Sequence, residues 1–266
     1  TTGEAPTTSD EEKIEIIKVV KRVVGSKIHV IAGAGNNETS HSVIQGQQAQ
    51  AAGADGLLVV TPYYNKPPQA GIEAHFKAMA NATDVPVMMY DIPGRTGVAI
   101  DPDTICRLAE HPNIVALKDA KGDVASTSWV IKRSGIPVYS GDDILNLPLL
   151  SVGAVGFVSV CGHTVGKELR EMLDSWFAGD AKRALEIHQK LLNESEDISR
   201  TVFEYLYPEL DHKHHAPVDP AVFDTVDIDV GSLRNYLHWL QTKSKHLKAQ
   251  QIKQYEFQAR LILAVA

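Results

Sequence analysis

A single lysine, Lys118, ends a short apolar stretch that begins at Ile114. A run of this length, bounded by His111-Pro112-Asn113 and by Gly122, is typical of a buried strand. A lysine amine loses its proton when it is desolvated, and it can then attack a carbonyl carbon to form a Schiff base, which arginine does not do. A salt-bridged lysine at a strand end is the commoner alternative, so the surrounding residues must decide between the two.

A Schiff-base lysine needs groups that move protons and groups that bind the carboxylate of its substrate. Tyr90 ends the apolar run before that of Lys118, and its hydroxyl is a candidate proton carrier. The hydroxyls and backbone amides of Thr1 and Thr2 are candidates for binding a carboxylate. The guanidinium of Arg95 can bind a second carboxylate through two parallel hydrogen bonds. The sequence therefore contains a nucleophile and the partners that carbonyl chemistry requires.

The elements that position these residues alternate between apolar runs and helix-like stretches over the first 160 residues. The runs are nearly continuous in apolar character, as in a parallel sheet that is buried on both faces. Ser9 and Glu12 form a capping-box pattern, which predicts a helix that Gly25 ends. The predicted strands are residues 29–32, 56–60, 86–90, 114–118, 137–140 and 156–160, and helices are predicted around 10–24, before 50, and around 73–79, 104–109 and 126–131, with one more before 156.

Polar and aromatic residues follow the ends of successive predicted strands. In an eight-stranded barrel all strand carboxyl ends face one mouth, so such residues converge. A doubly wound nucleotide-binding sheet is the alternative, but Gly33-Ala34-Gly35 lacks the third glycine of that fingerprint. We therefore expect an α/β fold, a (β/α)8 TIM barrel. The residues expected at its mouth are Asn36, Tyr63, Tyr64, Tyr90, Arg95, Lys118, Asp142 and Asp143.

Composition excludes several classes of function. The chain has 266 residues, of which 22% are charged, and its formal net charge is −7. This acidic balance does not indicate a basic surface for binding nucleic acid or an anionic membrane. No stretch has the length and apolarity of a membrane span, and no signal peptide is expected. Cys106 and Cys161 are a poor basis for a disulfide framework, and we interpret the histidine-rich residues 211–215 as a solvated loop instead of a metal site. A cytoplasmic protein is expected.

Six short motifs resemble, in order, those of the dihydrodipicolinate synthase family. The resemblance covers residues 1 to about 192, and the motifs are residues 1–4 (TTGE), 32–35 (AGAG), 61–67 (TPYYNKP), 90–97 (YDIPGRTG), 117–119 (LKD) and 140–143 (SGDD). It implies a (β/α)8 barrel with a helical extension and an aldol-type condensation of pyruvate with L-aspartate 4-semialdehyde in lysine and diaminopimelate biosynthesis. It also implies a homotetramer that needs no cofactor, because the reaction proceeds through a covalent lysine–pyruvate imine.

The resemblance assigns the catalytic roles. It implies that Lys118 forms the Schiff base with pyruvate. Tyr90, Thr1 and Tyr64 would form the proton relay, with Tyr64 reaching into the site of a neighbouring subunit.

The resemblance also assigns the binding roles, and these separate the synthase from its sister enzymes. Thr2 would hold the pyruvate carboxylate, Arg95 the carboxylate of the semialdehyde, and Gly141 and Val158 would line the site through their backbones. Lyases that act on N-acetylneuraminate or on 2-keto-3-deoxy sugar acids usually lack an arginine at the position of Arg95, so Arg95 favours the synthase. A degenerate barrel that acts only as a binding protein is the non-catalytic alternative.

Regulation by lysine is expected to be weak or absent. Lysine-inhibited members of the family usually have a glutamate where His41 stands, and a histidine or tryptophan near Asp10. An effector with an ammonium group needs that carboxylate, which a histidine cannot replace. Asn37 and Tyr63 match the family pattern.

The domain prediction has three parts. Residues 1–165 are expected to form six βα units of the barrel, and residues 166–210 a helical extension with helices at 167–177 and 181–192. Residues 211–266 have two interpretations. Residues 223–234 and 261–266 resemble segments that precede TTGE in the family, which predicts a circular permutation in which residues 216–223 and 261–265 complete the barrel. The rival interpretation is an unrelated tail, which leaves two sheet edges open.

Overall fold

The computed structural model describes residues 5–192, which fall into two compact units. The first consists of residues 5–159, and the second begins at Val160. Thr1, Thr2, residues 211–215 and the two segments predicted to complete a permuted barrel lie outside the described residues, so the predictions for them stay predictions.

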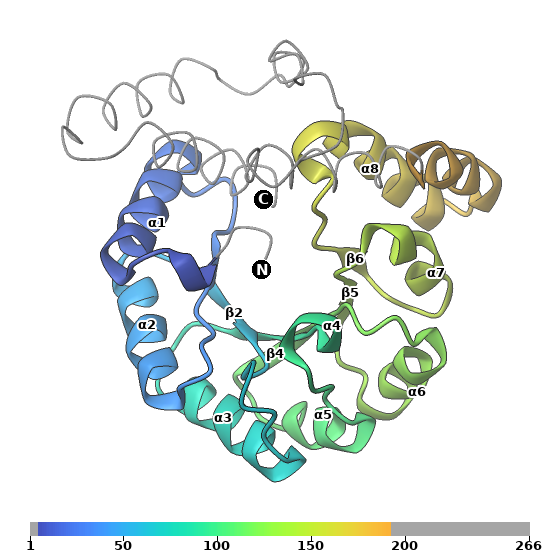
Figure 1. Ribbon diagram of the computed structural model, residues 1–266. Helices are drawn as coiled ribbons and strands as arrows, with labels where there is room; N and C mark the ends of the chain where they lie inside the picture. The colour runs from blue at the N-terminus through green and yellow to red at the C-terminus, as the bar shows by residue number, and fades with distance from the viewer. Residues whose placement is uncertain (1–4, 193–266) are drawn as a thin grey trace, which may run out of the picture. The chain divides into compact units, whose positions relative to one another are not determined.

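The first unit contains a parallel sheet of six strands in chain order (Figure 1). Each strand pairs in parallel with the next, as βαβ connections require. This confirms the six predicted strands and their parallel order. The strands are β1 (Ile31–Gly33), β2 (Gly56–Val60), β3 (Val87–Asp91), β4 (Ile114–Asp119), β5 (Val138–Ser140) and β6 (Gly156–Phe157).

Helices cover the outer face of this sheet (Figure 1). Ser9 and Glu12 form the predicted capping box, with Ser9 N to Glu12 Oε2 at 2.8 Å and Glu12 N to Ser9 Oγ at 3.3 Å, and Gly25 follows the last turn of the helix. The helices are α1 (Asp10–Val24), α2 (Thr39–Ala51), α3 (Gln69–Asn81), α4 (Pro93–Thr96), α5 (Pro102–Leu108), α6 (Val124–Ser134) and α7 (Asn146–Ser151), with 3-10 turns at η1 (Ala5–Thr7) and η2 (Asp143–Leu145).

The core of the first unit lies between the strands and the helices. Leu57, Met89 and Leu117 from the strands and Phe76 and Leu108 from the helices are all fully buried in one hydrophobic cluster. Burying a side chain of this size stabilises the fold by about 1.5–3 kcal/mol, so this layer holds the strands in place.

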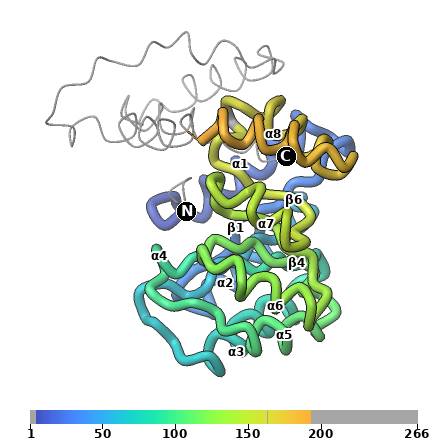
Figure 2. Tube along the Cα trace, turned by 90° about the vertical axis from the view of Figure 1, so that its right-hand side faces the viewer, coloured from blue at the N-terminus to red at the C-terminus, as the bar shows by residue number. Residues whose placement is uncertain are grey.

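The register of β3 and β4 determines which residues near their carboxyl ends share a face of the sheet. Tyr90 pairs with Lys118, and Asp91 pairs with Asp119. Successive residues of a strand point to opposite faces, so Tyr90 and Lys118 share one face and Asp91 and Asp119 share the other. Helix α4 lies beyond the carboxyl end of β3, at the mouth formed by the strand ends (Figures 1 and 2).

Three elements differ from the sequence prediction. Strand β6 ends at Phe157, so Val158 follows the strand instead of lying within it. Strand β1 begins at Ile31, two residues later than predicted. Helix α4 was not predicted, because a single turn that begins with Pro93 is too short to show helical periodicity.

The second unit contains the two predicted helices. Helix α8 (Gly162–Phe177) begins five residues before the predicted start, with a non-helical residue at Val165. Residues 181–192 are also helical, after the predicted break at Gly179-Asp180. Arg183 joins the two helices through an ion pair with Glu171 at 2.7 Å. No helix within residues 5–192 has the length and apolarity needed to cross a membrane.

Candidate active site

Lys118 is a buried lysine whose environment shifts the amine towards its neutral form. The residue is 8% exposed, and its Nζ lies 4.2 Å from the centroid of the Tyr90 ring. Burial lowers the pKa of Lys118 to about 8; the charge of Asp143 opposes this shift, and the charge of Arg95 adds to it. At pH 7 an amine with this pKa is neutral in about one molecule in ten, far more than for a solvated lysine. The lysine predicted as nucleophile therefore has the environment that a nucleophilic amine needs.

Tyr90 is fixed near the end of β3 by Thr61, which directly follows β2. It is 3% exposed, and its carbonyl oxygen accepts hydrogen bonds from the Thr61 amide at 3.0 Å and the Thr61 hydroxyl at 3.1 Å. Thr61 is itself fully buried. The structure thus brings together Tyr90 and Lys118, the two predicted residues on neighbouring strands.

Gly141 provides the space in which the Lys118 side chain lies. A Cβ atom at position 141 would lie 2.7 Å from Lys118 Cε and 2.9 Å from Lys118 Cγ, both shorter than side chains tolerate. The Gly141 amide donates to the Asp119 carbonyl at 2.7 Å, and the Val158 amide donates to the Ser140 carbonyl at 2.7 Å. Gly141 and Val158 are therefore held by their backbones, and Gly141 lies directly against the lysine.

Arg95 is placed by α4 at the mouth of the strands. Its side chain is exposed, and its charge acts on Lys118, which puts the guanidinium within electrostatic reach of the amine. Thr96 fixes the turn, because its hydroxyl donates to the carbonyls of Ile92 at 3.1 Å and Val98 at 2.8 Å. An exposed guanidinium beside a nucleophilic amine is suited to bind a carboxylate that arrives from solvent.

Asp143 is a site residue to which the sequence analysis gave no role. It is near enough to Lys118 to raise the pKa of the lysine, and its carboxylate is held by Asn146 Nδ2 at 3.1 Å and by the Ser159 hydroxyl. A carboxylate here would stabilise the positive charge of an iminium formed on Lys118. The only sequence signal was its position just past a strand end.

Tyr64 is not brought to Lys118 within this chain. It lies in the loop after β2 with a φ of 70° and is 86% exposed. A non-glycine residue with positive φ is uncommon and marks a constrained turn. Thr1 and Thr2, the other predicted members of the site, lie outside the described residues.

Among residues 5–192, no group of three or more His, Cys, Asp or Glu side chains is arranged to hold a metal ion.

Comparison with known proteins places these features in a family. The family model described as the dihydrodipicolinate synthetase family matches residues 1–207. A 4-hydroxy-tetrahydrodipicolinate synthase of Streptomyces coelicolor is 62% identical over 192 residues, which are 72% of this chain and 64% of that protein. The chain thus spans less than two thirds of the length of this relative.

Solved structures give the same result for the fold. The dihydrodipicolinate synthase of Bacillus anthracis is 38% identical, with a TM-score of 0.74, and the match covers 85% of this chain and 84% of that one. The chloride-inhibited dihydrodipicolinate synthase of Acinetobacter baumannii complexed with pyruvate is 37% identical, with a TM-score of 0.74, over 89% of this chain and 83% of that one. These matches confirm the predicted α/β barrel class and the predicted resemblance. The chain belongs to the dihydrodipicolinate synthetase family.

Proposed function

We propose that this protein condenses pyruvate with L-aspartate 4-semialdehyde through a Schiff base on Lys118, as a 4-hydroxy-tetrahydrodipicolinate synthase of lysine and diaminopimelate biosynthesis. The observation that carries the proposal is the buried Lys118 amine, with its pKa lowered to about 8 and its Nζ 4.2 Å from the Tyr90 ring centroid. The names of relatives at 53–62% identity support the same activity.

The first half of the proposed reaction forms the imine. The lone pair of the neutral Lys118 amine attacks C2 of pyruvate, and the carbonyl oxygen takes up a proton to give a carbinolamine. Loss of water then gives an iminium, whose charge the Asp143 carboxylate stabilises. In the proposal Tyr90, Thr1 and Tyr64 relay these protons, and Thr2 binds the pyruvate carboxylate. No cofactor is needed, because the iminium itself is the electron sink.

The second half forms the carbon–carbon bond. Loss of a proton from the pyruvate methyl group gives an enamine, whose carbon attacks the aldehyde carbon of the semialdehyde. The aldehyde oxygen takes up a proton to become a hydroxyl, and the iminium on Lys118 forms again. Arg95 binds the carboxylate of this second substrate, and the backbones of Gly141 and Val158 line the site. The amino group of the product then displaces Lys118 from the imine carbon, which closes the ring and restores the free enzyme.

The proposed assembly is a homotetramer in the cytoplasm, with Tyr64 completing the relay in a neighbouring subunit. The 86% exposure of Tyr64 in a constrained turn supports a contact outside its own chain. One similar structure is described as the first monomeric dihydrodipicolinate synthase variant, which fits an oligomer as the ordinary state of such enzymes. Cys106 and Cys161 are free thiols, which suits a reducing compartment.

The experiment is reductive trapping. Borohydride reduction in the presence of pyruvate should add the mass of the reduced adduct to Lys118, and Lys118→Arg, which keeps the charge, should lose the adduct and nearly all turnover. Turnover is then measured with aspartate semialdehyde and, separately, with N-acetylneuraminate and 2-keto-3-deoxy sugar acids. Trapping without condensation of the semialdehyde would favour a sugar-acid lyase. Labelling that survives Lys118→Arg would overturn the mechanism.

A further inference from the structure

We infer that Asp91 is a positioning residue that closes the loop carrying Arg95 and so sets the affinity for the second, carboxylate-bearing substrate. The inference rests on the proposed function of Arg95 and goes beyond it, because Asp91 lies on the opposite face of β3 from the reacting groups. Three side chains, Gln69, Asp91 and Lys121, hold residues 99–101; we call them the loop clamp.

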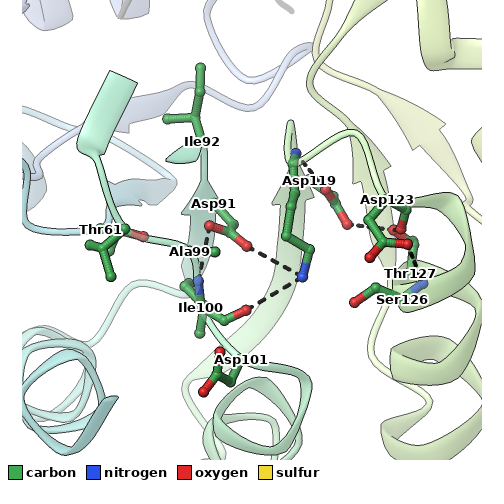
Figure 3. Close-up of polar contacts among 12 residues, drawn as sticks. Thr61, Asp91, Ile92, Ala99, Ile100, Asp101, Asp119, Asp123, Ser126 and Thr127 are labelled. Carbon is green, nitrogen blue, oxygen red and sulfur yellow. Dashed lines mark hydrogen bonds and ion pairs between the residues drawn. The ribbon is translucent and has the colours of Figure 1, made fainter. Parts of the chain in front are cut away.

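Asp91 is a fully buried member of the loop clamp. Figure 3 shows its side chain directed towards Ile100. Its Oδ1 accepts the Ile100 amide at 3.1 Å, which closes the chain between the end of β3 and Ile100. Its Oδ2 lies 3.8 Å from Lys121 Nζ, and within the described residues this oxygen has no hydrogen bond. Burial raises the pKa of Asp91 to about 7, so its role near neutral pH depends on its oxygen acceptor more than on a full charge.

The other two members of the loop clamp act on the same three residues from other elements. Lys121, after β4, donates to the Ile100 carbonyl at 3.4 Å. Gln69, at the start of α3, donates to the Ala99 carbonyl at 2.8 Å and accepts the Asp101 amide at 2.9 Å. Both the amide and the carbonyl of Ile100 are therefore bound by side chains.

The loop clamp determines where α4 can lie. The segment between Asp91 and Ile100 contains α4, and its two ends are joined by the Asp91–Ile100 hydrogen bond. The Ala120 amide also donates to the Asp91 carbonyl at 2.8 Å, so the base of the loop is fixed to the residues that follow Lys118. Arg95 projects from this closed loop, and releasing one end would let the guanidinium move relative to Lys118.

If Asp91 only stabilised the fold, its loss would impair imine formation and semialdehyde binding alike. The arrangement of the loop clamp predicts that only semialdehyde binding is impaired. Tyr90 and Lys118 are held by strand pairing and by Thr61, independently of the Ile100 amide. Loss of the loop clamp should therefore spare imine formation and impair binding of the semialdehyde, which is the phenotype expected of a displaced Arg95.

The test uses the full chain with pyruvate and aspartate semialdehyde. Asp91→Ala leaves the buried Ile100 amide without its acceptor, and we expect the KM for the semialdehyde to rise about tenfold or more. The rate of borohydride trapping by pyruvate should change less than about threefold, since the pairing of Tyr90 with Lys118 and the Thr61 hydrogen bonds stay in place. Asp91→Asn keeps an oxygen acceptor for the Ile100 amide and should restore most of the affinity.

Two further variants keep the test decisive. Lys121→Met removes the hydrogen bond to the Ile100 carbonyl. Because Lys121 is partly exposed, this variant should fold even if Asp91→Ala folds poorly, and it should also raise the KM for the semialdehyde. Thr127→Val is the matched control, because it removes a buried hydrogen bond of 2.6 Å to Asp119 on the neighbouring strand without touching residues 92–101. It should lower Tm and leave the KM for the semialdehyde unchanged.

The outcomes separate the inference from the proposed function. A wild-type protein that traps no pyruvate would overturn the proposed function. A wild-type protein that turns over, with an unchanged semialdehyde KM in Asp91→Ala and Lys121→Met, would overturn the inference alone. Equal loss of trapping and semialdehyde binding in both variants would assign Asp91 a structural role and would overturn it too.

Discussion

The Nζ atom of Lys118 lies 4.2 Å from the centroid of the Tyr90 ring, and the two residues are paired across β3 and β4. Parallel pairing places them at the same height in the sheet, with the aromatic ring beside the amine. The ring lies against the amine, and burial is the largest cause of the lowered pKa of Lys118. The pairing of these two strands thus prepares the nucleophile.

The pH dependence of trapping should follow Lys118. Because its pKa is about 8, the initial rate of pyruvate trapping should fall about tenfold for each pH unit below 8 and level off above it. Asp143→Asn removes a charge that raises this pKa, so its profile should shift to lower pH. Asp142→Asn, at the neighbouring position, is the matched control and should leave the profile in place. A profile that still rises through pH 10 would contradict the assignment.

Replacement of Gly141 should impair chemistry more than stability. A Cβ at position 141 would collide with the flexible end of Lys118, so the fold can relax by moving the amine away from Tyr90. We expect Gly141→Ala to change Tm little and to lower the trapping rate at least tenfold, because a misplaced nucleophile loses its orientation.

Gly56→Ala is the matched control for that experiment. Its Cβ would meet Ile31 Cδ1 at 2.8 Å, a similar collision at the amino end of β2, away from Lys118. It should lower Tm and keep the trapping rate. Equal trapping by Gly141→Ala and the wild type would show that the glycine is not needed for the position of the lysine.

The positions of Lys118 and Gly141, like the start of α1, could be predicted from the sequence, because their signals are local. The apolar run that ends in Lys118, the glycine after Ser140 and the capping box of α1 are all contained within a few residues. The loop clamp could not be predicted, because Asp91 and Lys121 are 30 positions apart and meet only when β3 pairs with β4. The role of Asp143 was missed for the same reason, since its effect on Lys118 depends on the alignment of separate strands.

Arg95 should govern the binding of the second substrate. Arg95→Ala removes a charge-assisted fork worth roughly 1.5–3 kcal/mol, so the KM for the semialdehyde should rise about ten- to a hundredfold. Removing this cation also raises the pKa of Lys118, so trapping by pyruvate is compared at pH 9, where the neutral amine prevails in both proteins. Arg95→Lys keeps the charge but not the two parallel N–H donors of the guanidinium. Its KM for the semialdehyde should therefore lie between those of the wild type and Arg95→Ala. Equal loss of pyruvate trapping at pH 9 would give Arg95 a different role.

His75 should weaken the fold at acid pH. It is 2% exposed, its Nδ1 lies 3.0 Å from Thr39 Oγ1, and burial lowers its pKa to about 4. The unfolded chain therefore binds more protons between pH 6.5 and 4, so this contribution is present above pH 6.5 and is lost as pH falls towards 4. We expect a loss of about 2 kcal/mol in the free energy of unfolding between pH 7.5 and 5 from this residue alone.

The measurement for His75 is denaturant unfolding at a series of pH values. His75→Leu should flatten the acid limb of stability. Phe76→Leu changes a buried neighbour that does not titrate, so it should lower stability by the same amount at every pH. Identical acid limbs for His75→Leu and the wild type would show that other groups dominate acid unfolding.

Inhibition by lysine should be weak or absent because of how His41 and Asp10 are engaged. His41 Nε2 lies 2.7 Å from Asp10 Oδ2, and Gln45 Nε2 donates to the other oxygen of Asp10 at 2.7 Å. These hydrogen bonds lower the pKa of the Asp10 carboxyl, with the His41 bond as the largest cause, so the carboxylate is already occupied. An ammonium effector would have to displace both partners and would then lie beside the imidazole.

The reversed pair tests this account. The exchanged pair, Asp10→His with His41→Glu, reverses the positions of the carboxylate and the imidazole and puts a carboxylate where lysine-inhibited members of the family usually have one. We expect steady-state turnover of the wild type to be insensitive to millimolar L-lysine and turnover of the exchanged protein to become sensitive. The single variant His41→Glu places two carboxylates side by side, which attract any cation. Its turnover should therefore discriminate less between L-lysine and other amines than turnover of the exchanged pair. Strong inhibition of the wild type at sub-millimolar lysine would refute the prediction, because it would mean that an effector binds despite the Asp10–His41 hydrogen bond.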